Sequence, residues 1–114
     1  MLISVKTGEE VLESLTRQLK ELDIRAGALV SIVGAVNACA LSNMSQDDAM
    51  VDHVTELVQP LELSGTGEIK EGIPHIHVVV SGEGNIATAG HLHWATVKEF
   101  FVNIYVVPMD STRL

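Results

Sequence analysis

The sequence lacks most of what a nucleic-acid binder, a disulfide-stabilised protein or a membrane protein requires. Its 114 residues include 7 Lys+Arg against 15 Asp+Glu, a formal net charge of -8, so it has no cation surplus with which to neutralise phosphates. The single cysteine, Cys39, excludes an intrachain disulfide and is typical of a reducing cytoplasm. No run reaches the roughly 18 consecutive apolar residues of a membrane-spanning helix. We therefore expect a cytoplasmic protein without direct contact to DNA or membranes.

Hydrophobic residues are abundant, at 46% of the chain, which is high for a soluble protein. The length fits one hydrophobic core, so we expect residues 1–114 to form a single domain. The N-terminal residues have neither the basic nor the apolar segment of a signal peptide, and we expect none. Some of the apolar surface is expected to lie against a partner subunit.

One helix is predicted near the N-terminus. The spacing of Thr7 and Glu10 matches a capping box, in which Thr7 would be the N-cap. Asp23 and Gly27 are predicted to close the helix. Its apolar positions follow a 3.6-residue period and form one stripe, composed of Val11, Leu12, Leu15, Leu19 and Leu22.

The rest of the chain favours β-strands with short antiparallel connections. A turn is predicted at Gly34 and a hairpin turn at residues 82–85, while no strand is predicted for residues 86–90. In the last strand, apolar residues occupy both faces, which requires either self-association or a curled sheet. The predicted strands are residues 28–33, 36–44, 51–58, 61–69, 75–81 and 97–107.

Four of the five histidines form two H-x-H pairs, His75 with His77 and His91 with His93, whereas His53 stands apart. Residues two apart on a strand share a face, so each pair presents two imidazoles side by side. Imidazole is a common ligand of zinc and other transition metals, and three ligands with an open fourth position are typical of reactive zinc sites. A polar row facing solvent is the alternative interpretation, and the sequence does not give the strand register that would decide between them.

Other chemical motifs are absent or ambiguous. The sequence contains no phosphate-binding G-x-x-x-x-G-K-[ST] loop, no G-x-G-x-x-G after a strand and no H-E-x-x-H, which argues against ATP and dinucleotide chemistry. Glu62, Glu68 and Glu71 are candidates for an acid or base beside a metal, although the same positions suit a solvated strand face and turn. Cys39 has apolar neighbours and is interpreted as a small buried hydrophobe.

Several segments resemble the PPC ("plants and prokaryotes conserved") domain in its stand-alone prokaryotic form. The resemblance spans nearly the whole chain and includes residues 7–15, 24–36 and 61–69. Its most specific part is the sequence Pro-His-Ile-His-Val at residues 74–78, followed by Ala-Gly-His-Leu at residues 89–92. These are similar to the family's H-x-H and G-G-H-L motifs, with Ala89 in place of the first glycine.

The resemblance implies an α+β fold in which one main helix packs on a strongly bent, mainly antiparallel sheet and the chain assembles as a homotrimer. It also implies that a divalent transition metal, zinc foremost, is held by His75, His77 and His91, while His93 lies outside the family motif. Plant members carry Arg-rich AT-hooks beside the domain. No such hook is present here, and no Lys or Arg occurs between Arg25 and Lys70.

Three functions are compatible with this resemblance. The first is a homotrimeric module without established catalysis that binds a metal or small ligand through the histidines, with a further protein partner as an option. The second is a metal-dependent lyase or decarboxylase, since the fold resembles that of acetolactate decarboxylase, whose zinc is also held by three histidines. The third is a transcription-associated DNA-binding protein, which the acidic charge disfavours.

Overall fold

The computed structural model describes residues 1–110, which form one helix and one eight-stranded sheet. The strand order is β1-β8-β2-β5-β6-β7-β3-β4, and every neighbouring pair is antiparallel. The predicted α+β class, with one helix on an antiparallel sheet, is therefore confirmed. In chain order the elements are β1 (Leu2–Val5), α1 (Val11–Glu21), β2 (Gly27–Val36), β3 (Ala38–Met44), β4 (Asp52–Leu57), β5 (Leu61–Lys70), β6 (Ile73–Ser81), β7 (Ala87–Thr96) and β8 (Val102–Pro108).

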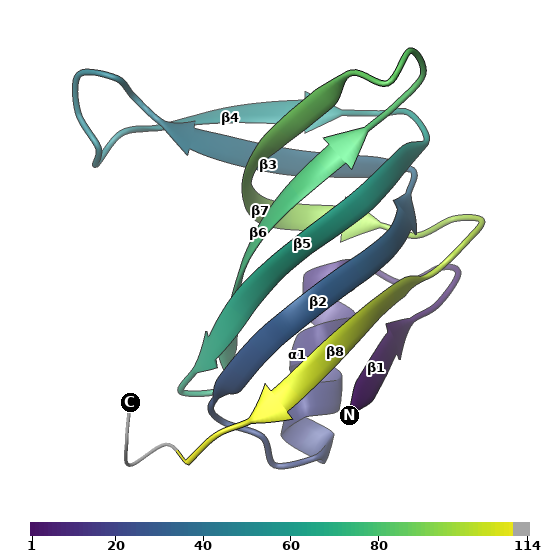
Figure 1. Cartoon of the computed structure of the whole chain (residues 1–114), viewed down its shortest axis with the longest axis vertical. Helices are drawn as coiled ribbons and strands as arrows, with labels where there is room; N and C mark the ends of the chain where they lie inside the picture. Colours follow the sequence, from purple (N-terminus) through teal and green to yellow (C-terminus); the bar gives the residue numbers. More distant parts are fainter. Residues whose placement is uncertain (111–114) are drawn as a thin grey trace.

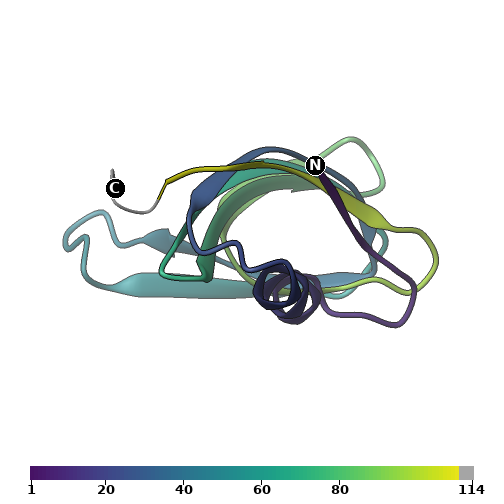
Figure 2. The ribbon, with the colours of Figure 1, turned by 90° about the horizontal axis from the view of Figure 1, so that it is seen from below.

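The sheet curls over α1, and the hydrophobic core fills the space between them (Figures 1 and 2). β-bulges increase the local bending of the sheet at two places. The register of β2 with its neighbours shifts between Leu29 and Ile32, and the register of β3 with β7 shifts at Ala40/Leu41. The helix contributes the predicted apolar stripe to the core through Val11, Leu15 and Leu19, with Leu12 partly buried beside them. The prediction was wrong for Leu22, which is the C-cap and is exposed.

The start of the helix differs from the prediction. Glu10, and not Thr7, is the N-cap, because Gly8 has a positive φ of 90° and Glu10 is still extended and bridged to Thr96. The Glu10 carboxylate accepts hydrogen bonds from the backbone N–H groups of Leu12, Glu13 and Ala95, each at 2.9 Å. One side chain therefore caps the helix and ties it to β7.

The end of the helix agrees better with the prediction. Asp23 adopts a positive φ of 54° and its N–H donates to the Lys20 carbonyl, while the Ile24 N–H donates to the Leu19 carbonyl. These bonds satisfy carbonyls that the helix leaves without an internal partner. Gly27 lies beyond this cap and is already the first residue of β2.

The predicted turn at Gly34 is wrong, because β2 continues to Val36 and the chain bends at Asn37 before it enters β3. Gly34 is required for close packing within the strand: a Cβ there would collide with the Phe101 carbonyl oxygen. The last strand is also shorter than predicted. Residues 97–101 form a connection in which Phe100 and Phe101 are exposed, and β8 begins at Val102.

Two strands had no counterpart in the sequence prediction. β1 is a short edge strand beside β8, and β7 includes residues 87–90, which are too small and polar to show a strand pattern. The omission of β7 matters for function because this strand carries His91.

The outer face of the sheet, defined as the face turned away from α1, retains exposed apolar side chains. Exposed and buried residues alternate along the strands, and the exposed apolar residues on this face include Val33, Val79, Tyr105 and Val107. The β3–β4 hairpin projects from one end of the sheet, and five of the six β4 residues are exposed (Figures 1 and 2). Cys39 is fully buried and burial raises its pKa, in agreement with its interpretation as a core residue.

Within residues 1–110, no helix has the length and apolar character needed to cross a bilayer, since α1 has only 11 residues.

Candidate metal centre

The first histidine pair lies on β6, where burial alternates with residue number. Ile76, Val78 and Val80 point into the core, so His75 and His77 point to the outer face, as strand geometry requires. On the neighbouring β5, Glu68 stands opposite His75 and Thr66 stands opposite His77. Local β-structure alone therefore places the two imidazoles side by side.

The third histidine lies on β7 and is paired with both of its neighbouring strands. His91 lies opposite His77 of β6 and opposite Ser42 of β3. Leu92 is buried in the core, so His91 faces outward with the first pair. The strand register, which the sequence could not supply, thus brings the two H-x-H pairs together.

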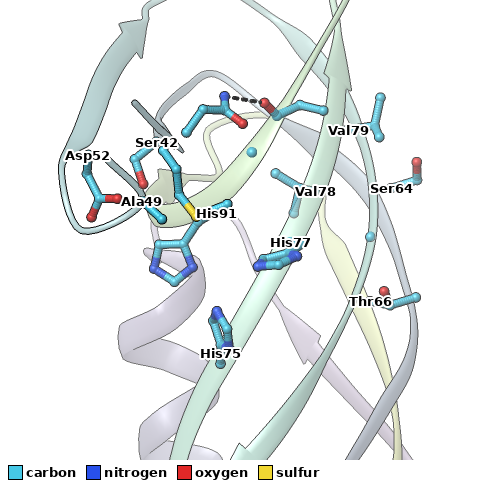
Figure 3. Close-up of a pocket in the computed structure, with 15 residues that line it drawn as sticks. Ser42, Ala49, Asp52, Ser64, Thr66, His75, His77, Val78, Val79 and His91 are labelled. Atoms are coloured by element: carbon cyan, nitrogen blue, oxygen red, sulfur yellow. Dashed lines mark hydrogen bonds between the residues drawn. The ribbon is translucent and has the colours of Figure 1, made fainter. Parts of the chain in front are cut away.

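The three imidazoles form a tight cluster. The ring centroids of His75 and His77 are 4.9 Å apart, those of His75 and His91 are 4.8 Å apart, and those of His77 and His91 are 6.0 Å apart. One ring nitrogen from each residue lies within 4.8 Å of the other two. Figure 3 shows the three side chains directed toward one another on the outer face.

The other two histidines are outside this cluster. His93 is the extra residue of the β7 bulge, since Trp94 pairs with Ala40 and Leu92 pairs with Leu41. Its ring centroid is 4.9 Å from that of His91, but it does not join the group of three converging nitrogens. His53 lies on β4 opposite Asn43.

His91 has an environment that favours its neutral form. Burial lowers the pKa of His91, and the neighbouring His75, His93 and His77 lower it further, whereas the Asp52 carboxylate opposes the shift. Neutral imidazole is the form that binds metal ions. The buried Nδ1 atom of His91 has no hydrogen-bond partner within the described chain, which costs free energy unless a ligand satisfies it.

A cavity of about 1030 Å³ opens beside the cluster, between the β3–β4 hairpin and strands β6 and β7. Asp52 and Ser42 line it on the far side of His91 from His75 and His77 (Figure 3). Asn43 also lines it and donates a hydrogen bond of 2.9 Å to the Ala89 carbonyl, where β3 and β7 no longer pair. Asp52 and Ser42 could not be predicted from the sequence, because only the strand register across β7, β3 and β4 brings them near the histidines.

The glutamates considered from sequence are distributed differently. Glu68 is adjacent to His75 across the β5–β6 ladder, so it is near the cluster, but it does not line the cavity. Glu62 pairs with Ser81 at the opposite end of β5, and Glu71 lies in the tight turn after Lys70 with a positive φ of 53°. Glu62 and Glu71 therefore do not lie beside the histidines.

The donor set fits a transition metal better than Ca²⁺ or Mg²⁺. Three imidazole nitrogens suit zinc, copper, iron or nickel, whereas Ca²⁺ and Mg²⁺ prefer oxygen ligands. The unpartnered Nδ1 atom and the lowered pKa of His91 are both consistent with a nitrogen available for coordination. A four-coordinate metal held by these three residues would have one further position for a ligand.

Together, these features define a small α+β domain with a candidate three-histidine metal centre on the outer face of its sheet. The chain belongs to the Plants and Prokaryotes Conserved (PCC, also written PPC) domain family, whose sequence profile matches residues 1–110. The resemblance noted from the sequence is thereby confirmed.

Solved structures support the same fold. A metal-containing protein from Archaeoglobus fulgidus has 30% sequence identity and a TM-score of 0.75, over 95% of this chain and 77% of that chain. A PPC protein from Pyrococcus horikoshii has 21% identity and a TM-score of 0.72, over 96% of this chain and 80% of that one. A protein from Bacteroides thetaiotaomicron described as a "putative dna binding protein" has 21% identity and a TM-score of 0.82, over 96% of this chain and 78% of that chain. No curated protein matches the sequence.

Proposed function

We propose that this chain is a metal-binding PPC-domain protein that holds a divalent transition metal, with zinc as the preferred ion, through His75, His77 and His91. The observation that carries the proposal is the convergence of one nitrogen from each residue within 4.8 Å. The A. fulgidus relative, which is described as metal-containing, supports it. The metal would supply a Lewis-acid centre with one open position for a small ligand.

Metal content of the purified, tag-free protein tests this proposal. We expect one zinc ion per chain by elemental analysis, and loss of that ion in His75→Ala, His77→Ala and His91→Ala. His53→Ala removes an imidazole outside the cluster and is expected to keep the metal. A wild-type protein that stays metal-free after zinc loading and dialysis would show that the histidines form a polar row on the strand surface and not a metal site.

We further propose that the protein is a homotrimer whose subunits cover the apolar part of the outer face. Four exposed apolar residues, Val33, Val79, Tyr105 and Val107, lie on this face, and water contact with such a surface is unfavourable. Sedimentation equilibrium is expected to give about three times the chain mass of 12.3 kDa. Val33→Asp should weaken assembly, whereas Leu22→Asp, at an exposed apolar position on the helix side of the molecule, is the matched control. A monomeric wild-type protein would refute the assembly.

Direct DNA binding is not part of this proposal. The relatives titled as DNA-binding proteins share only 21% identity with this chain, which establishes a common fold and no common ligand. The net charge of -8 repels the phosphate backbone. No observation on this chain favours the lyase alternative over binding alone.

A further inference from the structure

The cavity beside the histidine cluster has an unusual balance of charge. Asp52 is the only Asp, Glu, Lys or Arg among the 15 residues that line it. The remaining lining combines the three imidazoles with small, apolar and hydroxyl side chains, among them Ala89, Val79 and Ser42. Apart from a bound metal ion, the cavity thus offers a carboxylate as its one ionised group and provides no cationic side chain for an anionic ligand.

Strand register fixes how Asp52 lies relative to the metal ligands. His91 of β7 is opposite Ser42 of β3, and Met44, two residues further along β3, is opposite Asp52 of β4. In a flat sheet, two strand spacings and two residues would separate the Cα atoms of His91 and Asp52 by roughly 12 Å. Their side chains line the same cavity, so a small molecule bound there can contact both.

We propose that this cavity binds a small amine-bearing ligand, such as an amino acid or amino alcohol, whose oxygen coordinates the metal and whose ammonium group faces Asp52. The inference rests on the proposed metal site and deepens it by assigning the class of ligand. A metal ion attracts the oxygen donor, and the carboxylate attracts the opposite, cationic end of the same molecule.

The surrounding charge supports this class over polyanions. The β3–β4 hairpin and its loop contain Asp47, Asp48, Asp52 and Glu56, and no Lys or Arg occurs between Arg25 and Lys70. A phosphorylated ligand would meet this acidic hairpin with the metal as its only counter-charge. A zwitterion meets complementary charge at both ends of the cavity.

Co²⁺-loaded protein provides a test, because cobalt in a histidine site has visible absorption bands that respond to a new ligand. The probes are β-alanine, which has a carboxylate and an ammonium group, and propionate, which has the carboxylate alone. Since Asp52 is exposed, its pairing with the ammonium is worth up to about 1 kcal/mol, or roughly fivefold in affinity. We expect β-alanine to bind roughly fivefold more tightly than propionate.

Two variants separate the contribution of Asp52 from general charge. Asp52→Asn should abolish the preference for β-alanine, whereas Glu56→Gln, on the same strand but outside the cavity, should retain it. Equal binding of both probes to the wild-type protein, or an unchanged preference in Asp52→Asn, would overturn the ligand assignment while leaving the metal site intact. Absence of cobalt bands before any probe is added would instead refute the metal site, and the ligand assignment would fall with it.

Discussion

The replacement of Glu10 by Ala offers the sharpest test of how the helix is fixed to the sheet. One carboxylate oxygen accepts from the Glu13 N–H, and the other accepts from both the Leu12 and Ala95 N–H groups. Ala has no side-chain acceptor, so all three N–H groups lose this partner. Ala95 is fully buried, which prevents water from replacing a bond lost there.

The expected loss follows from two separate contributions. Loss of an N-cap interaction costs about 1 kcal/mol, and a buried N–H left without an acceptor costs about 1–3 kcal/mol. Glu10→Ala should therefore lower the free energy of unfolding by about 2–4 kcal/mol, which corresponds to a fall in Tm on the order of 10 °C for a domain of this size.

Denaturant unfolding followed by circular dichroism measures this difference directly. Glu13→Ala is the matched control, because it removes the same side-chain carboxylate from the same helical turn at an exposed position. That control should change stability by only about 0.5 kcal/mol. Equal destabilisation by the two substitutions would show that the effect of Glu10 is general helix electrostatics, and would refute the proposed link between α1 and β7.

Three further predictions concern single residues. Because the pKa of His91 is lowered, the unfolded chain binds protons more readily, so the free energy of unfolding of metal-free protein should fall as pH drops below about 6.5. Unfolding titrations at several pH values should show a weaker pH dependence in His91→Asn than in the wild-type protein; identical slopes would contradict the assignment. Gly34→Ala should cost about 1–3 kcal/mol by overpacking against the Phe101 carbonyl, and an unchanged denaturation midpoint would show that the strands can separate without penalty. The buried Cys39 thiol, whose pKa is raised, should react with a thiol reagent only as the protein unfolds, so rapid modification at neutral pH would disprove its burial.

The parts of the fold that follow local patterns could be predicted from the sequence. The apolar stripe of α1 has a clear 3.6-residue period, and β5 and β6 lie close to their predicted ranges because polar and buried residues alternate along them. Gly34 was misassigned because glycine permits both a turn and close strand packing, and only the neighbouring Phe101 distinguishes these roles. The N-cap was misassigned because the bridge between Glu10 and Thr96 is a long-range contact.

The candidate site shows the same division between local and long-range information. The outward direction of His75 and His77 follows from their spacing on one strand. The position of His91 opposite His77 depends on the register of β6 and β7, and the sequence prediction had no strand at residues 87–90. Family resemblance supplied the three-histidine set that periodicity could not. Neither strand periodicity nor the family resemblance predicts Asp52 at the site, because Asp52 reaches the cavity through the pairing of β3 with β4.

The location of the cluster also bears on the choice between a metal site and a polar row. A row of solvated histidines gains nothing from burying a ring nitrogen, yet the Nδ1 atom of His91 is buried without a hydrogen-bond partner among residues 1–110, at a cost of about 1–3 kcal/mol. The neighbouring imidazoles further disfavour the protonated form of His91, whose pKa is lowered. Both features oppose a polar row and favour coordination, since a metal ion satisfies the nitrogen and requires neutral imidazoles. The acidic chain adds attraction for the cation, so geometry, protonation and net charge all favour metal binding at His75, His77 and His91.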